Sequence, residues 1–140
     1  MKRATIAAAA IALAMTGFGP AAGAYAEGDP AKGKRVYRKC QACHSVAPGE
    51  AKAAGPNLFG IIGRQAGTGG YGYSDSLIEA GEAGLNWSEE TVDAYLRDAK
   101  SFVADWLGVD RRKVRDKMNF RLRSEAQRAD VIAYLISLSK

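Results

Sequence analysis

The sequence predicts an all-α domain of three to five helices. Apolar residues recur at helical spacing in three stretches of the chain, and each stretch begins beside a residue that can cap a helix. No stretch alternates apolar and polar residues with the period of two that a half-buried strand shows. We therefore expect one domain of helices joined by irregular loops in this chain of 140 residues.

The N-terminal segment is typical of a secretory signal peptide rather than of the helical domain. A positively charged start precedes an apolar run over residues 6–15, which is short for a membrane span of roughly 20 residues. Ala24-Tyr25-Ala26 then fits the small-x-small pattern that signal peptidases cleave. We expect residues 1–26 to be removed and residues 27–140 to act in the periplasm, with a retained anchor as the alternative.

The mature chain carries only a small positive charge. Without Lys2 and Arg3 it has 18 basic and 15 acidic residues, a net charge of +3. That charge is ordinary for a soluble domain and argues against nucleic acid as a partner. The mature part is also small for a large apolar core, so a buried cofactor would add to its stability.

The first helix is predicted to begin at residue 30. Asp29 can cap it, and Pro30 suits its first position. A glycine on its apolar stripe would let another helix approach closely, because glycine has no Cβ. The stripe consists of Gly33, Val36, Tyr37 and Cys40, and we expect the helix to run into residues 40–44.

A long loop and three helices follow. Residues 47–73 are rich in glycine, and loops of such length are uncommon unless something holds them, for which a buried cofactor is a candidate. Ser88 can cap a helix with an apolar face, and a short helix is expected over residues 102–107. The sequence from Ser124 to Gln127 is a capping box in front of the last helix.

The pentapeptide CQACH, Cys40 to His44, has the C-x-x-C-H pattern of haem attachment. On a helix, positions i, i+3 and i+4 lie on one face. Two thiols placed in this way can form thioethers with the two vinyl groups of one porphyrin, and the imidazole that follows falls beneath the iron.

Three other interpretations of Cys40 and Cys43 are weaker. A thioredoxin-like redox pair would be expected near a βαβ pattern, which the sequence lacks. A zinc site would need further ligands, and the mature chain has no other cysteine and no second histidine. A disulfide between two such close residues would form a very small loop and stabilise little.

Met118 is the candidate for the second axial ligand. It is the only methionine of the mature chain, as His44 is its only histidine. A His/Met pair raises the potential of the haem iron, and two strong ligands leave no position for oxygen or peroxide. Met118 lies beside Asn119 and several arginines, which suits a loop ligand better than a core residue. We therefore expect an electron carrier and not an enzyme.

Several stretches of the mature chain follow one another in a recognisable order and spacing: GDPAKGKRVY, CQACH, GPNLFGIIGR, GYGYSD, LNW, AYL, KMNF and RADVIAYL. In these stretches the sequence resembles class I cytochromes c, most closely the soluble bacterial c2-type proteins. The resemblance implies that the first and last helices cross beside one haem c. Cys40 and Cys43 would bind this haem covalently, and His44 and Met118 would ligate its iron.

The resemblance also implies roles for further residues. The carbonyl of Pro56 would accept a hydrogen bond from the other ring nitrogen of His44, which fixes the ring and tunes its basicity. Ordinary core packing is the alternative role for each aromatic residue. The remaining residues that the resemblance places against the haem are Arg64, Tyr73 and Trp87 at the propionates, Tyr95 on the Met118 side, and Phe120 over the edge.

Two departures from the family pattern concern the segment before Met118. Sixteen positions separate Phe102 from Met118, more than in the shortest family members, and the extra length is densely charged. Asp116 stands where the family often has a threonine near a propionate. An acid there would repel that carboxylate.

Basic residues cluster before the haem motif and around Met118. On this fold both clusters would border the exposed haem edge, which predicts a positive docking face for acidic redox partners, with plain solvated surface as the alternative. The first cluster is Lys32, Lys34, Arg35, Arg38 and Lys39, and the second is residues 111–117 with Arg121 and Arg123.

The resemblance implies a mobile, monomeric carrier of single electrons. Its donor would be a quinol–cytochrome c oxidoreductase or a periplasmic dehydrogenase. Its acceptor would be a cytochrome oxidase, a photosynthetic reaction centre or a denitrification reductase. Two rival functions stay open at this point. A haem enzyme or gas sensor would need an accessible iron, and a thiol–disulfide oxidoreductase would need exchanging Cys40 and Cys43 without haem.

Overall fold

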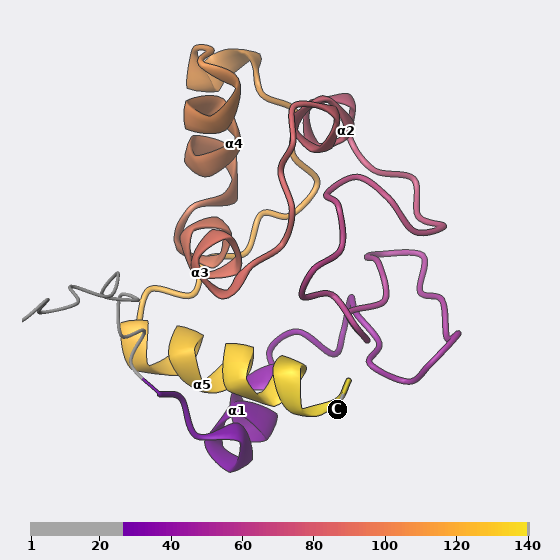
Figure 1. The fold of residues 1–140 in the computed structure, drawn as a ribbon, viewed down its shortest axis with the longest axis vertical. Helices are drawn as coiled ribbons and strands as arrows, with labels where there is room; N and C mark the ends of the chain where they lie inside the picture. The colour runs from indigo at the N-terminus through magenta and orange to yellow at the C-terminus, as the bar shows by residue number, and fades with distance from the viewer. Residues whose placement is uncertain (1–26, 140) are drawn as a thin grey trace, which may run out of the picture.

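A computed structural model describes residues 27–139, and in this part of the chain it contains five α-helices and one short 3-10 helix (Figure 1). The only β geometry in the described residues is an isolated antiparallel bridge between Gln65 and Asn86. The prediction of an all-α fold is confirmed. The helices are α1 (Pro30–Tyr37), α2 (Asp75–Glu82), α3 (Glu89–Arg97), α4 (Ala99–Leu107), η1 (Arg111–Lys113) and α5 (Glu125–Ser137).

Helices α1 and α5 lie against each other and cross, as the resemblance implied (Figure 1). Gly33 permits the contact, because an ideal Cβ at this position would lie 1.9 Å from the carbonyl oxygen of Asp130. The Asp29 backbone N–H donates to the Asp130 carboxylate at 2.8 Å, and the rings of Tyr37 and Tyr134 pack with centroids 5.6 Å apart. The crossing therefore depends on direct backbone contact at one glycine.

Two predicted helix boundaries were wrong. Helix α1 ends at Tyr37, so it stops before the cysteines instead of running into them. Helix α4 begins at Ala99 and not at residue 102, because the Asp98 side chain caps it by accepting from the Ser101 N–H at 3.1 Å.

Helix α2 was not predicted from the sequence. It has eight residues, and Ser74 at its N-cap makes no side-chain capping hydrogen bond, so local signals are weak. The helix depends on tertiary contact, since a Cβ at its Gly81 would lie 2.0 Å from the Ala66 carbonyl oxygen.

The predicted capping box before α5 forms only in part. The Ser124 hydroxyl accepts from the Gln127 N–H at 3.4 Å, but the Gln127 side chain accepts from Lys39 Nζ of the α1 end at 2.8 Å. The reciprocal box occurs instead at α3, between Ser88 and Thr91. A tertiary contact to the turn after α1 thus replaces the second hydrogen bond of the capping box at α5.

The long loop after the cysteines, in residues 45–74, is held by hydrogen bonds to its own backbone and to the segment after α2. The Asn57 side-chain amide donates to the carbonyls of Ala47 and Glu50 at 2.6 and 2.7 Å. The Gly63 N–H donates to Trp87 O at 2.7 Å, and the next bond in this pairing joins Trp87 N to Arg64 O at 2.9 Å. These bonds give the loop a defined course without regular secondary structure.

Within residues 27–139, none of the helices combines the length and the apolar character that a membrane span requires. The predicted signal peptide, residues 1–26, lies outside the described residues.

Replacing Gly33 by alanine tests the crossing. The added Cβ would meet backbone atoms of α5, so the helices must separate, and we expect the free energy of unfolding to fall by about 1–3 kcal/mol or more. Urea unfolding of the haem-loaded protein measures this. Gly72→Ala is the control, because the nearest atom to a Cβ there is Lys117 Nζ at 3.9 Å. Equal urea midpoints for the two variants would contradict the proposed contact.

Candidate haem site

The residues of the haem motif share one helical turn directly after α1. The Gln41 N–H donates to Tyr37 O at 3.1 Å, and the His44 N–H donates to Cys40 O at 2.9 Å, so the backbone between them coils like a helix. Cys40 is half-buried and Cys43 is exposed, and the two residues are not joined in a disulfide. The spacing expected from the sequence therefore holds, although the turn is separate from α1.

The imidazole of His44 is held on one side by the backbone of the long loop. Its Nδ1 lies 2.7 Å from the carbonyl oxygen of Pro56, which can only accept. Nδ1 must therefore carry the proton, and Nε2 keeps the lone pair that a metal needs. A Cβ at Gly55 would lie 2.8 Å from Cε1 of the ring, so glycine is needed there. The Tyr37 hydroxyl also donates to the His44 carbonyl at 2.8 Å.

The environment of Cys40 does not suit thiol–disulfide exchange. Burial raises the pKa of the Cys40 thiol, and the nearby Lys39 charge opposes this only in part. Catalytic thiols of oxidoreductases have lowered pKa values, because the thiolate is the nucleophile. The raised pKa of Cys40 therefore argues against this thiol as the nucleophile of a redox exchange.

Met118 lies in the segment that leads into α5. Its side chain is partly buried and packs against the core. Its backbone N–H donates to Oδ1 of Asp116 at 2.7 Å, and the Tyr95 hydroxyl of α3 donates to both oxygens of that carboxylate at 3.2 Å. Burial raises the pKa of Asp116, while the hydrogen bonds from Met118 N–H and Tyr95 lower it. The methionine is thus tied to α3 through an acid.

The structure brings together three of the residues expected near the propionates. The Arg64 guanidinium donates to Asn57 O at 2.9 Å, and Trp87 N–H donates to Arg64 O. Burial raises the pKa of Tyr73, and the adjacent Arg64 charge opposes the shift. The Trp87 ring is buried and meets the Tyr95 ring edge-on, with centroids 5.0 Å apart.

Phe120 is less enclosed than Tyr73, Trp87 and Tyr95, the other aromatic residues expected at the haem, with 36% of its surface exposed. Sequence reasoning missed two neighbours of the site, Gly55 and the Asp116 carboxylate as a partner of Met118. A signal for Gly55 was available, because it directly precedes Pro56 in a loop that must approach the histidine. For Asp116 the sequence showed only a departure from the family pattern.

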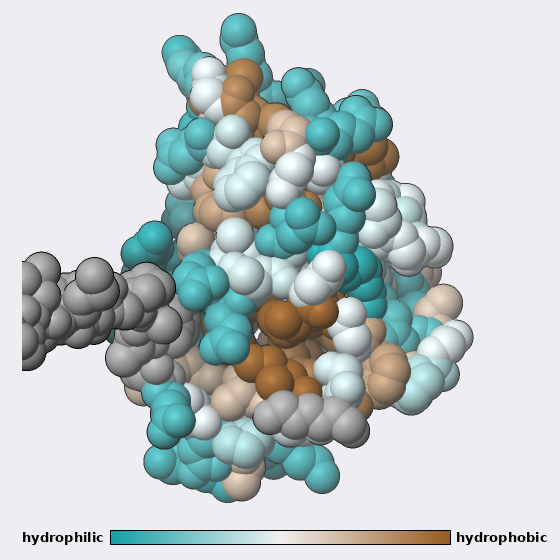
Figure 2. Space-filling view, in the orientation of Figure 1, coloured by the Kyte–Doolittle hydropathy of each residue, from teal (hydrophilic) through white to brown (hydrophobic). Residues whose placement is uncertain are grey.

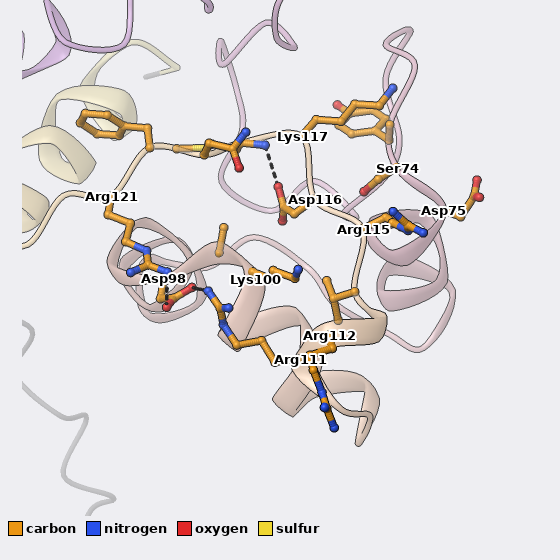
Figure 3. Close-up of a pocket in the computed structure, with 16 residues that line it drawn as sticks. Ser74, Asp75, Asp98, Lys100, Arg111, Arg112, Arg115, Asp116, Lys117 and Arg121 are labelled. Carbon is orange, nitrogen blue, oxygen red and sulfur yellow. Dashed lines mark hydrogen bonds and ion pairs between the residues drawn. The ribbon is translucent and has the colours of Figure 1, made fainter.

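A polar pocket of about 580 Å³ lies on the Met118 side of the site (Figure 3). Asp98, at the end of α3, pairs with Arg111 at 3.5 Å and with Arg121 at 2.9 Å, so one carboxylate joins segments on both sides of Met118. The basic residues that line the pocket are Lys100, Arg111, Arg112, Arg115, Lys117 and Arg121.

The residues present fit a haem c. Two cysteines and an imidazole with a directed Nε2 lone pair share one turn, and a thioether sulfur lies in a partly buried loop. Figure 2 shows a hollow bordered by apolar side chains in the middle of one face. Apolar residues that pack against the core without being fully covered include Val46, Leu58, Ile62, Tyr73, Tyr95 and Phe102. Within residues 27–139, no cluster of three or more His, Cys, Asp or Glu residues could hold another metal ion.

The family model for cytochrome c matches residues 30–139 of the chain. The chain belongs to the cytochrome c family. It is 46% identical to cytochrome c2 iso-2 of Rhodospirillum centenum, over 81% of this chain and 98% of that protein. It is 40% identical to cytochrome c-551 of Roseobacter denitrificans, over 93% of this chain and 94% of that protein.

Solved structures agree with this assignment. The chain superimposes on cytochrome c2 from Rhodospirillum centenum with a TM-score of 0.76 and 46% identity, covering 81% of this chain and all of that one. Cytochrome c-550 from Paracoccus versutus gives a TM-score of 0.73 at 36% identity, again over 81% of this chain. This cytochrome is thus of class I and of the c2 type, and the predicted fold is confirmed.

Membership of the family also decides the cofactor and the class of activity. The protein carries one covalently bound haem c, for which Cys40 and Cys43 supply the C-x-x-C-H pattern. It is a mono-haem electron-transfer protein and not an enzyme, and it works with redox partner proteins.

Replacing Gly55 by alanine tests the orientation of His44. The Cβ would collide with the ring, so we expect the bond between Nδ1 and Pro56 O to lengthen and the imidazole to become a weaker donor. If the bond contributes about 1 kcal/mol to the ferric form, the reduction potential should rise by roughly 40 mV. Redox titration measures this, with Gly72→Ala as the control. An unchanged potential would mean that the bond does not tune the iron.

Proposed function

We propose that this cytochrome shuttles single electrons in the periplasm through a haem iron ligated by His44 and Met118. The observation that carries the proposal is the 2.7 Å contact between His44 Nδ1 and Pro56 O, on the same turn as both cysteines. This contact leaves Nε2 as the only ring nitrogen available to iron. Met118 is the only thioether in the described part of the chain.

The haem supplies an iron that gains and loses one electron without bond rearrangement. The protein would hold the two ligand residues in place before and after the electron is transferred. Pro56 fixes the imidazole, and the Asp116 contact fixes the backbone of Met118. Arg64, Tyr73 and Trp87 would enclose the propionates, while Tyr95 and Phe120 would cover the Met118 side and the edge. A neutral thioether favours the ferrous state and so raises the potential.

Residues 1–26 would direct the chain through the inner membrane and then be removed. Haem would be attached to Cys40 and Cys43 after export. The mature protein would diffuse between membrane complexes as a monomer. Its donor would be a quinol–cytochrome c oxidoreductase or a periplasmic dehydrogenase, and its acceptor an oxidase, a photosynthetic reaction centre or a reductase.

The two basic clusters would form the docking face for these partners. All the basic residues of both clusters are exposed. Lys39 of the first cluster bonds to Gln127, four positions after Arg123 of the second, so the clusters meet at the start of α5. A positive face of this kind steers acidic partners and loses effect as salt screens it.

Absorption spectra test the ligation. We expect a low-spin c-type spectrum with the far-red band of a methionine–ferric bond, and no change when carbon monoxide is added to the reduced protein. Met118→Ala should abolish the band and admit carbon monoxide, while Asn119→Ala should leave both properties unchanged. Rapid carbon monoxide binding by the wild type would favour a gas sensor or haem enzyme. A protein without any haem spectrum would refute the proposal.

Salt dependence tests the docking face. Electron transfer from a purified quinol–cytochrome c oxidoreductase should slow several-fold as ionic strength rises through roughly 0.01–0.15 M. The variant Arg115→Gln/Arg123→Gln should be slower at low salt and less sensitive to it. Arg97→Gln is the control, because this exposed residue of α3 lies outside both clusters. A rate that is indifferent to salt would remove the docking argument.

A further inference from the structure

The carboxylate of Asp116 has an unusual set of partners for an acid in a charged loop. Neighbouring acids pair with arginines: Asp110 with Arg112 at 2.9 Å, and Asp98 with Arg121 at 2.9 Å. Asp116 instead accepts from the Met118 backbone N–H at 2.7 Å (Figure 3). It also accepts from the Tyr95 hydroxyl at 3.2 Å. Its two oxygens therefore join the methionine-bearing loop to α3.

The position of the Tyr95 hydroxyl is itself well defined. The Tyr95 ring packs edge-on against Trp87 and Phe102, with centroid distances of 5.0 and 6.3 Å. Burial raises the pKa of Tyr95 well above its ordinary value, so the phenol keeps its proton and remains a donor. The Asp116 side chain thus has a fixed partner on a packed helix.

The loop is held to the rest of the protein on both sides of Met118. Upstream, Val114 is 2% exposed and the Arg115 N–H donates to Ser76 Oγ at 2.9 Å. Downstream, the Leu122 N–H donates to Leu96 O at 2.8 Å. Between these points, the Asp116 contact acts on the methionine backbone itself.

We propose that Asp116 is a positioning residue that holds Met118 in place for ligation by linking its backbone N–H to Tyr95 of α3. The inference rests on the proposed axial role of Met118. A ligand from solution can bind the ferric iron only after Met118 has left, and the loop must then give up these hydrogen bonds. The Asp116 link therefore raises the free energy that is needed to displace Met118 from the iron.

Displacement by imidazole tests the inference. Ferric haem-loaded protein is titrated with imidazole at one fixed pH while the far-red band is followed. Hydrogen bonds to a charged acceptor are strong enough that Asp116→Ala should increase the apparent affinity for imidazole roughly tenfold. Asp116→Asn, which keeps one acceptor oxygen for the Met118 N–H, should show a smaller increase, and so should Tyr95→Phe.

The double variant Asp116→Ala/Tyr95→Phe separates the link from independent effects. If the two residues act through one another, the double variant should bind imidazole no more tightly than Asp116→Ala alone. Asp110→Asn is the matched control, because it removes the same charge from the same segment before Met118, and Asp110 pairs only with Arg112 among the described side chains. Its imidazole affinity should equal that of the wild type.

Three results would overturn the inference, and the third differs from the first two in what it removes. Wild-type imidazole affinity in Asp116→Asn and Tyr95→Phe, with the far-red band intact, would show that the link does not position the methionine. The same conclusion would follow if Asp110→Asn increased the apparent affinity for imidazole as much as Asp116→Asn did. A wild-type protein without the far-red band would instead remove the axial role of Met118, and the inference with it.

Discussion

The crossing of α1 and α5 at Gly33 is the constraint on which the rest of the molecule depends. The backbone of α5 occupies the space that a side chain at position 33 would need. Helix α1 leads directly into the turn of Cys40 and His44, and α5 is entered directly from the segment that carries Met118. Where the two helices meet therefore decides where both halves of the haem site begin.

Helix α3 is the platform for the other half of the site. Asp93 on this helix forms a buried ion pair with Arg128 of α5 at 2.6 Å, and the same guanidinium donates to the carbonyls of Leu122 and Arg123. Burying two charges is costly, so such a pair persists only when its remaining hydrogen bonds are made, as they are here. Tyr95 and the Leu96 carbonyl add contacts to Asp116 and Leu122. Helix α3 thus makes hydrogen bonds to the segments on both sides of Met118.

Several features followed from local sequence because local physics decides them. The Asp29 cap and the apolar stripe predicted α1, and Ser88 predicted the start of α3. The haem motif was evident because two cysteines and a histidine at this fixed spacing have few other uses in a chain with one histidine. Helix α2 was missed because eight residues without a side-chain cap become helical only when packed against the Ala66 segment. The capping box at Ser124 forms only in part, because the Gln127 side chain accepts a hydrogen bond from Lys39 instead of from the N-cap backbone.

The sequence by itself determined the helical class and the cofactor, and it predicted the residues that would bind this cofactor, since spacing and residue type are properties of the chain alone. Only the tertiary structure decided which ring nitrogen of His44 is free, because Pro56 reaches it from a different segment. It also decided what Asp116 does. In the sequence this acid was a departure from the family pattern with an expected repulsion. In the fold its oxygens accept from Tyr95, 21 positions away, and from Met118. These hydrogen bonds depend on how distant segments of the chain pack together, which a local sequence pattern does not reveal.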